Sequence, residues 1–434
     1  MKKVAFYTLG CKVNTYDTEA LVEIFEKKGY TIVNFEEKAD VYVVNTCTVT
    51  NLGDRKSRKM IRKAKKMNED AIIVVAGCYA QTAPEELIRI PEVNLVIGNK
   101  DRKNIVNLVE EISENEQDKI NAVGNIMEEA NFEDLSVYEM KGKTRAFIKI
   151  QEGCNQFCSY CIIPYARGLI RSRRPESVLK EVKKLVDANY NEVVLTGIHV
   201  ASYGRDLEDS SLLQLIQEIH EVEGIERIRL SSLEPRLLTK DFLKELSKLP
   251  KFCPHFHISL QSGSDSVLKA MKRKYTTAEY KQYVQIVREY FPLASITTDI
   301  MVGFPGEGER EFRETYNFAK EIAFSKIHVF KYSPRKGTPA AKYPNQVNGK
   351  VKEERSKKLI ALAEKMEGEY YHQFIETTKK VLFEQEDLNR NGYYEGLTDN
   401  YIRVFAQSNE DIKGQIRSVL LERTYKNHME GKII

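Results

Sequence analysis

The feature that most restricts the fold of this chain is its repeated alternation of short apolar strands with amphipathic helices. In the first third, β-branched runs at 4–10, 41–46 and 72–77 precede helical patterns at about 14–28, at 53–67 and from 82 onward. Strands that are apolar along their whole length are typical of a parallel sheet buried on both faces. We therefore expect an α/β domain with helices on both sides of its sheet.

The same unit recurs six times in the middle of the chain, with strands expected at 146–151, 192–197, 227–232, 255–260, 295–302 and 326–333. Six β/α units predict an incomplete (β/α)6 barrel, whose chemistry lies on the loops after the strands. A charged helix at about 350–374 precedes β-like runs typical of a small all-β barrel. We expect domains at 1–137, 138–372 and 373–434, and an irregular or partly helical linker at 107–140.

The compartment of the protein bears on its seven cysteines. The sequence has no run of about 18 apolar residues that could span a membrane, and its apolar start is too short for a signal peptide. We therefore expect a cytoplasmic protein without membrane association. Disulfides are rare in that compartment, so the cysteines are expected to bind metal or to act in catalysis.

The motif GCNQFCSYC places Cys154, Cys158 and Cys161 on the loop after the first barrel strand. Thiolates suit iron–sulfur clusters, and this loop can bind three irons of a [4Fe–4S] cluster while the fourth stays open. An open iron can bind S-adenosylmethionine (SAM) and cleave it to a 5′-deoxyadenosyl radical. A structural zinc site is the alternative, but it usually takes four protein ligands from paired motifs. The spacing and its context resemble the radical SAM superfamily.

A second trio, Cys11, Cys47 and Cys78, is expected just past the carboxyl ends of three strands. Open α/β sheets bind ligands at this edge, and neighbouring strands lie about 5 Å apart. The three thiolates are therefore expected to converge on a second cluster that also keeps one iron open. Three buried core cysteines are the alternative, since free cysteine is common in cores.

Several segments together carry a family resemblance: TLGCKVNTYDTEAL, VVNTCTVT, VAGCYAQ, GCNQFCSYCIIPYARG, LSSLEP, HISLQSGSDSVLKAMKRKYT and DIMVGFPGE. They resemble the radical SAM methylthiotransferases over essentially the whole chain, including a C-terminal segment similar to the TRAM RNA-binding domain. The resemblance implies two [4Fe–4S] clusters. The cluster on Cys154, Cys158 and Cys161 generates the radical from SAM. The auxiliary cluster on the other trio carries the sulfur, which a further SAM methylates.

The segments GCKVN and TGIHVASYG are similar to the branch that acts on N6-threonylcarbamoyladenosine in tRNA. That resemblance implies methylthiolation at C2 of adenosine 37, and a cationic pocket would suit the carboxylate of this substrate. Sister branches act on isopentenyl adenosine in tRNA or on an aspartate of a ribosomal protein. A non-enzymatic, metal-containing protein that binds RNA or transfers electrons is the alternative of another class.

Other residues are candidates for SAM binding because they end barrel strands two, three and four, where the methionine and ribose groups of SAM are expected. Gly303 follows strand five, where it is expected to approach the adenine. In the superfamily, the backbone at the aromatic residue before the third cysteine meets the adenine, and Tyr160 occupies that position. Turn or capping roles are the alternative for the others. The candidates are Tyr160, Thr196, Gly197, Ser231, Ser232, Glu234, Gln261 and Gly303.

The net charge is only +4, so contact with RNA must come from local basic patches. One patch lies on one face of the helix after Cys47, and the other follows the radical-site cysteines, although a solvated helix face is the alternative. We expect the anticodon stem-loop of tRNA and a reductant such as flavodoxin or ferredoxin as partners, and a monomer. The candidate RNA contacts are Arg55, Arg58, Lys59, Arg62, Arg171, Arg173 and Arg174.

Overall fold

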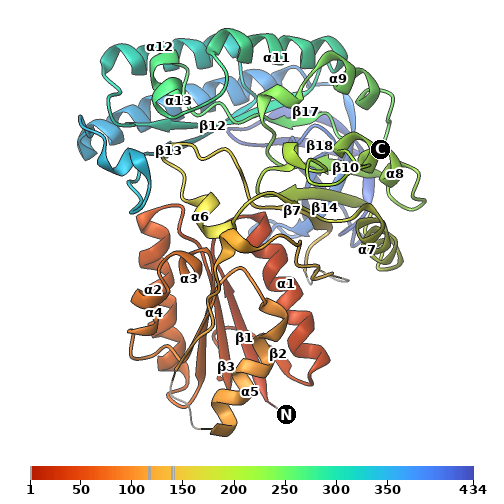
Figure 1. The fold of residues 1–434 in the computed structure, drawn as a ribbon. Helices are drawn as coiled ribbons and strands as arrows, with labels where there is room; N and C mark the ends of the chain where they lie inside the picture. Colours follow the sequence, from red (N-terminus) through yellow and green to blue (C-terminus); the bar gives the residue numbers. More distant parts are fainter. Residues whose placement is uncertain (1, 116–118, 138–139, 141) are drawn as a thin grey trace.

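The computed structural model describes residues 2–115, 119–137, 140 and 142–434. Its first part is a six-stranded parallel sheet in the order β2-β1-β3-β4-β5-β6, with helices on both faces (Figure 1). The strands are β1 (Lys3–Thr8), β2 (Thr31–Val33), β3 (Val41–Thr46), β4 (Ile72–Gly77), β5 (Leu95–Ile97) and β6 (Ile120–Asn121). The helices are α1 (Lys12–Lys27), α2 (Asn51–Met67), α3 (Cys78–Thr82), α4 (Pro84–Ile88) and α5 (Ile105–Asn115), with a 3-10 turn η1 (Arg102–Asn104).

Both faces of this sheet are buried because alternate strand residues enter two separate apolar cores. Val43 and Val74 belong to the core that α1 and α5 cover. Tyr42 and Ile73 belong to the core that α2, α3 and α4 cover. The prediction of a parallel sheet covered on both faces is confirmed. The sequence did not predict β2, β5 and β6, because strands of two or three residues are too short to show a pattern of polar and apolar residues.

The acidic stretch at 107–140 is partly helical, as expected, but its first part belongs to the N-terminal sheet domain and not to a linker. Helix α5 continues to Asn115, and Val106, Val109 and Ile112 of this helix pack in the core at helical spacing. Strand β6 then adds an edge to the sheet. The remainder to residue 144 is irregular apart from a 3-10 turn, η2 (Ile126–Glu128). Residues 138, 139 and 141, next to the expected domain boundary, lie outside the described residues.

The middle of the chain forms the expected open β/α barrel. Its strands are β7 (Arg145–Glu152), β9 (Glu192–Gly197), β10 (Arg227–Leu230), β11 (His255–His257), β12 (Ser295–Val302) and β13 (Lys326–Lys331). They pair as β10-β9-β7 and β11-β12-β13, and an isolated bridge between Leu233 and Ile258 joins the two sheets. No strand pair among the described residues closes β13 onto β7, so the barrel is open there.

Helices cover the outside of the barrel (Figure 1). Ser211, Thr239 and Thr276 begin three of them by accepting a hydrogen bond from a backbone N–H of the first turn. A short strand, β8 (Arg171–Ser172), pairs antiparallel with β7. The helices are α6 (Ile163–Arg167), α7 (Pro175–Asp187), α8 (Leu212–His220), α9 (Lys240–Leu246), α10 (Asp265–Ala270), α11 (Thr277–Tyr290) and α12 (Glu309–Ile322), and the 3-10 turns are η3 (Val200–Ser202), η4 (Pro235–Leu237) and η5 (Pro339–Lys342).

Helix α13 (Gly349–His372) leads into a closed barrel of five strands in the order β14-β15-β16-β18-β17. This C-terminal barrel packs against the starts of β7 and β10. Arg145 pairs with Glu384 at 2.7 Å, and Arg227 donates to the carbonyl oxygen of Lys380 at 2.7 Å. The strands are β14 (Thr378–Glu386), β15 (Tyr393–Thr398), β16 (Arg403–Gln407), β17 (Ile416–Thr424) and β18 (Met429–Ile433). Among the described residues, no helix combines the length and apolar character needed to cross a bilayer.

Candidate active site

The loop after β7 carries Cys154, Cys158 and Cys161. It turns at Gly153, which has a φ of +74° and where a Cβ would lie 1.8 Å from the carbonyl oxygen of Leu169, so only glycine fits. The backbone N–H of Cys161 donates to the carbonyl oxygen of Cys158 at 2.9 Å. The three cysteines line one cavity of about 160 Å³. The sequence motif is thus a preformed three-thiol loop.

The residues predicted to bind SAM divide between two cavities and one packing position. Four of them line the cavity of the three cysteines: Tyr160, Ser232, Glu234 and Gln261. Three others, and Ser232 again, line a larger cavity beside it: Thr196, Gly197 and Ser231. Gly303 has a φ of +75° and packs so closely on α13 that a Cβ would lie 2.3 Å from the Lys352 side chain. Gly303 lines neither of these two cavities.

Burial controls the acid–base chemistry of the first trio. It raises the pKa of Cys154 to about 11 and the pKa of Cys161 to about 12, because a thiolate is poorly solvated there. Arg273 partly offsets this, since its Nη1 donates to Sγ of Cys158 at 3.4 Å. Thiolates in this loop therefore need a bound cation for full stabilisation, and three soft sulfur ligands fit the iron of a cluster.

Cys11, Cys47 and Cys78 lie at the carboxyl edge of the N-terminal sheet. Strands β3 and β4 are paired to their last residues, so Cys47 and Cys78 leave the sheet side by side. Cys11 follows the neighbouring strand β1 after a turn at Gly10, where a Cβ would lie 3.2 Å from Sγ of Cys47. Burial, together with the nearby thiols of Cys78 and Cys11, raises the pKa of Cys47 to about 11. The three thiols thus belong to one group.

Neither trio has the geometry of a single-ion site. In the described part of the chain, no three His, Cys, Asp or Glu side chains gather tightly enough to hold one metal ion. A [4Fe–4S] cluster binds each thiolate through a different iron and so requires wider spacing, whereas zinc draws four ligands around one ion. Among the described residues, the compact donor set of a structural zinc site is therefore not present.

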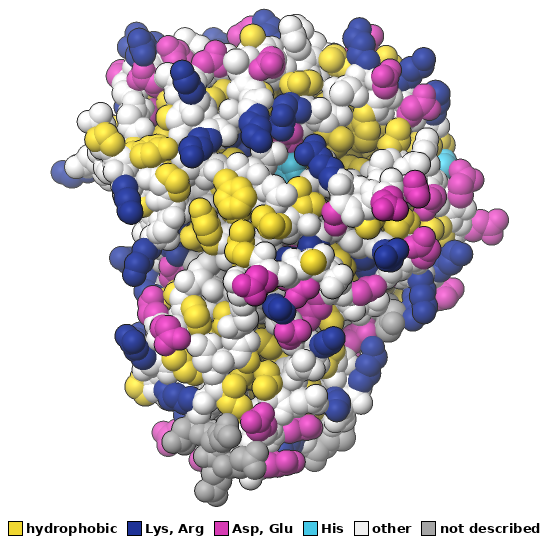
Figure 2. Space-filling view, viewed as in Figure 1, with side chains coloured by type: hydrophobic (Ala, Val, Ile, Leu, Met, Phe, Trp, Pro, Cys, Tyr) yellow, Lys and Arg dark blue, Asp and Glu magenta, His cyan; other side chains and the backbone are white. Residues whose placement is uncertain are grey.

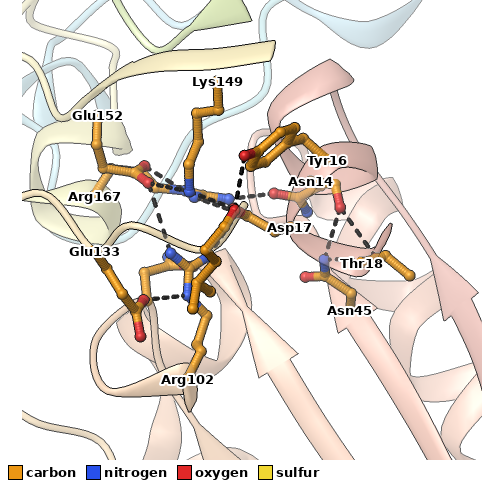
Figure 3. A network of polar contacts seen from close by, with 12 residues as sticks. Asn14, Tyr16, Asp17, Thr18, Asn45, Arg102, Glu133, Lys149, Glu152 and Arg167 are labelled. Atoms are coloured by element: carbon orange, nitrogen blue, oxygen red, sulfur yellow. Dashed lines mark hydrogen bonds and ion pairs between the residues drawn. The ribbon is translucent and has the colours of Figure 1, made fainter. Parts of the chain in front are cut away.

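A buried ion network joins the two cysteine-bearing regions (Figure 3). Arg167, at the end of α6, donates from Nε to Sγ of Cys78 at 3.2 Å. Its Nη1 contacts the carboxylates of Asp17 at 2.7 Å and Glu152 at 2.9 Å. Lys149 contacts the same two carboxylates at 2.5 and 3.0 Å. Because Asp17 belongs to α1 and Glu152 ends β7, the network fixes the sheet against the barrel.

The carboxylates of this network stay ionised despite complete burial. Burial alone would raise the pKa of Asp17, but Arg102, Lys149 and Arg167 hold it well below its usual value. Burial would likewise raise the pKa of Glu152, but Arg167 and Lys149 lower it to about 2. Charged partners thereby keep Arg167 in place beside the thiol of Cys78.

A cavity of about 510 Å³ separates the cysteine edge of the sheet from the barrel. Three parts of the chain line it: Cys11 and Lys12 of the N-terminal sheet domain, strand ends of the barrel, and Tyr401 of the C-terminal barrel. Ser232 lines both this cavity and the cavity of the first cysteine trio, so the two adjoin. Cys11, a member of the second trio, therefore faces a space next to the first trio.

Tyr401 closes one side of the larger cavity from the turn between β15 and β16. Its backbone is left-handed, with a φ of +68°. Its ring stacks on His255, with centroids 4.3 Å apart and planes inclined by 2°. The guanidinium groups of Arg145 and Arg229 lie 5.7 and 5.0 Å from its centroid. Cations and a stacked imidazole thus hold this ring.

The two predicted basic patches have different outcomes. On α2, Arg55, Lys59 and Arg62 are exposed, whereas Arg58 contacts Tyr79 and Glu86 of the neighbouring helices. Figure 2 shows Lys and Arg interspersed with Asp and Glu over the face that it draws, so positive charge does not gather on one surface there. The exposed basic patch on α2 therefore consists of Arg55, Lys59 and Arg62, because Arg58 makes contacts within the protein.

The prediction that Arg171 and Arg173 contact phosphate is wrong for this structure. Their exposed fractions are 2% and 1%, and Arg173 pairs with Glu181 at 2.5 Å. The guanidinium of Arg171 donates to the carbonyl oxygen of Arg167 at 2.9 Å. Both side chains point inward, where buried oxygen atoms accept their hydrogen bonds. Arg174, in contrast, is exposed to solvent.

Sequence reasoning missed four residues of the site. Arg167 and Arg273 each donate to a cysteine thiol, and Lys12 and Tyr401 line the larger cavity. In the sequence, Arg167 is one of several basic residues that follow the cysteine motif, and nothing distinguishes it from the others. Arg273 lies in the segment ending KRKYT, and Lys12 follows the first cysteine directly. Nothing in the sequence around Tyr401 indicates that it reaches the barrel.

The fold and the cysteine loop define the class of protein. Residues 148–319 match the family described as "Radical SAM superfamily", and residues 3–98 match "Uncharacterized protein family UPF0004". A solved radical SAM methyltransferase, TsrM from Kitasatospora setae, has the same fold with a TM-score of 0.60, at 16% identity over 78% of this chain and 77% of that chain. The protein is thus a radical SAM protein with an additional N-terminal sheet domain.

Curated relatives specify the family. The chain is 46% identical to "Threonylcarbamoyladenosine tRNA methylthiotransferase MtaB" of Bacillus subtilis, over 100% of this chain and 97% of the relative. It is 43% identical to the protein of the same name from Aquifex aeolicus, over 96% and 100%. A "tRNA-2-methylthio-N(6)-dimethylallyladenosine synthase" of Sulfurihydrogenibium is 35% identical over 98% of both chains. The chain belongs to the radical SAM tRNA methylthiotransferase family, with the threonylcarbamoyladenosine tRNA methylthiotransferases.

Proposed function

We propose that this protein adds a methylthio group to C2 of N6-threonylcarbamoyladenosine at position 37 of tRNA. The observation that supports this best is the pair of adjoining cavities that share Ser232. One is lined by Cys154, Cys158 and Cys161, and the other is lined by Cys11 of the second trio. A substrate in the larger cavity would lie between a radical source and a sulfur source. The names of the relatives supply the substrate.

Each trio fits a [4Fe–4S] cluster because it presents three thiols with a guanidinium nearby. Arg273 donates to Cys158, and Arg167 donates to Cys78. When bound, the first cluster supplies the electron that cleaves SAM to a radical, and the second supplies the sulfur. N–H donors to cluster sulfurs stabilise negative charge, so both arginines are positioning residues for this chemistry.

The residues around the first trio form the proposed SAM site. Tyr160, Glu234 and Gln261 line the cavity of the cysteines, where Glu234 is buried and accepts from Arg236 at 2.9 Å. Thr196, Gly197 and Ser231 face the larger cavity and are proposed to contact the region where SAM and substrate meet. Gly303 supports the site indirectly, by letting α13 pack closely.

The wider assignments follow from the same proposal. We assign residues 1–137 to the auxiliary-cluster domain, 138–372 to the radical domain and 373–434 to the TRAM-like barrel. The exposed Arg55, Lys59, Arg62 and Arg174 are proposed to contact phosphates of the anticodon stem-loop. A monomer that works in the cytoplasm with flavodoxin or ferredoxin as its reductant fits this role.

The decisive experiment is nucleoside mass spectrometry of tRNA from a strain that lacks the gene. We expect the methylthiolated threonylcarbamoyl nucleoside to disappear and its unmethylthiolated precursor to accumulate. Unchanged levels would refute the proposed substrate.

Two cysteine variants test the division of labour in purified, anaerobically reconstituted enzyme. Cys154→Ala is expected to abolish SAM cleavage, because it removes a ligand of the radical cluster. Cys47→Ala is expected to retain some SAM cleavage but to transfer no sulfur. Cys253→Ala, at a buried cysteine outside both trios, is the matched control and is expected to keep both activities. Methylthiolation by the Cys47→Ala variant would contradict the assignment of the second trio.

A further inference from the structure

The larger cavity contains a lysine whose charge is not balanced. Lys12 lines it next to Cys11, and Lys326, His257 and Asp299 line it from the barrel. Lys326 pairs with Glu367 at 3.0 Å, and Asp299 lies 3.3 Å from Nε2 of His257, a contact that is an ion pair only when the imidazole is protonated. Among the described residues, Lys12 has no carboxylate within ion-pairing distance. Of the two lysines that line this cavity, Lys326 is paired, whereas Lys12 makes no ion pair with the described residues.

The surroundings of Lys12 do not supply the missing anion. The groups that act electrostatically on Lys12 are the phenol of Tyr401, the guanidinium groups of Arg145 and Arg229, and the carboxylate of Glu192. Glu192 is already engaged by Arg229 at 2.7 Å, and Arg145 is paired with Glu384 at 2.7 Å. The charged neighbours of Lys12 are thus paired with one another or with other residues, and Lys12 itself has no ion-pair partner among the described residues. A partly buried lysine in this position is suited to an anionic ligand.

We propose that Lys12 binds the carboxylate of the threonyl group of the substrate nucleoside and selects for that group. This inference rests on the proposed function and adds the residue that would recognise the substrate. In adenine, C2 and C6 flank the ring nitrogen N1, and C6 carries N6, so a group attached to N6 on the N1 side lies close to the atom that reacts. Lys12 follows Cys11 directly, so a base brought to the auxiliary site places its N6 arm near this lysine. The cavity of about 510 Å³ is of a size suited to a nucleoside.

The experiment compares two anticodon stem-loop oligonucleotides, one with the threonylcarbamoyl carboxylate and one with a carboxamide in its place. Dissociation constants and kcat/KM are measured for the reconstituted full-length enzyme. Losing a hydrogen bond between charged partners typically costs about 10- to 100-fold in affinity. We expect wild-type protein to prefer the acid by that factor and Lys12→Gln to bind both forms equally. Lys12→Arg should restore most of the preference.

Lys326→Gln is the matched control, because it removes the charge of another lysine of the same cavity. It is expected to keep the preference for the acid, since its ammonium is already paired. Iron content and substrate-free SAM cleavage are measured for every variant to show that the neighbouring Cys11 site is intact. A loss of SAM binding in Lys12→Gln with an unchanged acid-to-amide ratio would assign Lys12 to the cofactor and overturn the proposal.

The wild-type measurement decides the matter even if Lys12→Gln cannot be loaded with iron. Equal affinity of wild-type protein for the acid and the amide would overturn the inference, and so would an unchanged ratio in Lys12→Gln. A failure of the proposed function looks different, because wild-type enzyme would then methylthiolate neither oligonucleotide. Methylthiolation of both at equal kcat/KM would leave the proposed function standing and remove only the role of Lys12.

Discussion

At the scale of single residues, Arg167 shows how a buried charge can hold a site together. It is fully buried, and its three nitrogen atoms face polar partners: the thiol of Cys78, the carboxylates of Asp17 and Glu152, and the side-chain oxygen of Asn14. Burying a guanidinium is costly unless each donor is satisfied. Removing it would leave two buried carboxylates with fewer cations and the thiol without its donor.

We therefore expect Arg167→Gln to lower the free energy of unfolding by about 3–5 kcal/mol, the usual cost of breaking a buried ion pair. Chemical denaturation of the purified protein measures this. Arg174→Gln is the matched control, because Arg174 is exposed, and a surface change of this kind typically costs less than about 0.5 kcal/mol. Equal stability of the two variants would show that the network of Asp17 and Glu152 does not need Arg167.

At the scale of elements, the loop after β7 depends on one backbone position. Gly153 combines a positive φ with an approach to the Leu169 carbonyl that leaves no room for a side chain. This close approach brings the start of the cysteine loop against the segment after α6, where the N–H of Cys154 donates to the carbonyl of Gly168 at 3.0 Å. The loop is thus shaped by its backbone before any ligand binds.

Gly153→Ala is accordingly expected to disrupt this loop, and the iron bound after reconstitution should fall toward the amount for one cluster. The matched control is Gly142→Ala, which has a similar φ of +77° but no atom within 4 Å of the added Cβ. That control should cost only the strain of a left-handed residue, about 1–2 kcal/mol, and keep both clusters. Full iron loading of Gly153→Ala would mean that the loop can rearrange around the methyl group.

At the scale of the whole molecule, three parts of the chain build one cavity. The sheet domain contributes Cys11 and Lys12, the barrel contributes its strand ends, and the C-terminal barrel contributes Tyr401. Figure 1 shows the sheet domain below the radical barrel, with α6 at their junction. The C-terminal barrel is therefore part of the wall of the candidate active site, in addition to any role in holding RNA.

This arrangement predicts that Tyr401→Ala disturbs the wall of the larger cavity, although Tyr401 lies far in the sequence from the other residues that line it. Because Tyr401 is half-buried, we expect a loss of about 1–3 kcal/mol in the free energy of unfolding, together with weaker binding of the modified stem-loop. Thermal unfolding and a binding titration measure the two effects. Tyr425→Ala in the same barrel is the control, because Tyr425 is 43% exposed, and it should change neither quantity substantially. Unaltered stem-loop binding by Tyr401→Ala would place the substrate away from this wall.

The sequence by itself determined the architecture and the two cysteine trios. Strand and helix periodicity is a local property, and so is the spacing of Cys154, Cys158 and Cys161, so both are visible without coordinates. The adjacency of Cys47 and Cys78 followed from strand order in a parallel sheet. The helical character of 105–115 was obscured because this segment runs into the acidic stretch that follows, and its own acidic residues mask the helical spacing of Val106, Val109 and Ile112.

Only the tertiary structure decided which polar residues serve those thiols and which lie in the core. Arg171 and Arg173 look like phosphate ligands in the sequence, yet they contact the carbonyl oxygen of Glu129 and the carboxylate of Asp134, which belong to the segment before β7. The contact of Arg167 with Cys78 and the position of Tyr401 in the cavity depend on how separate domains pack. The sequence shows the chemical type of each residue. The partners of these residues lie far away in the chain, and only the packing of the domains brings them into contact.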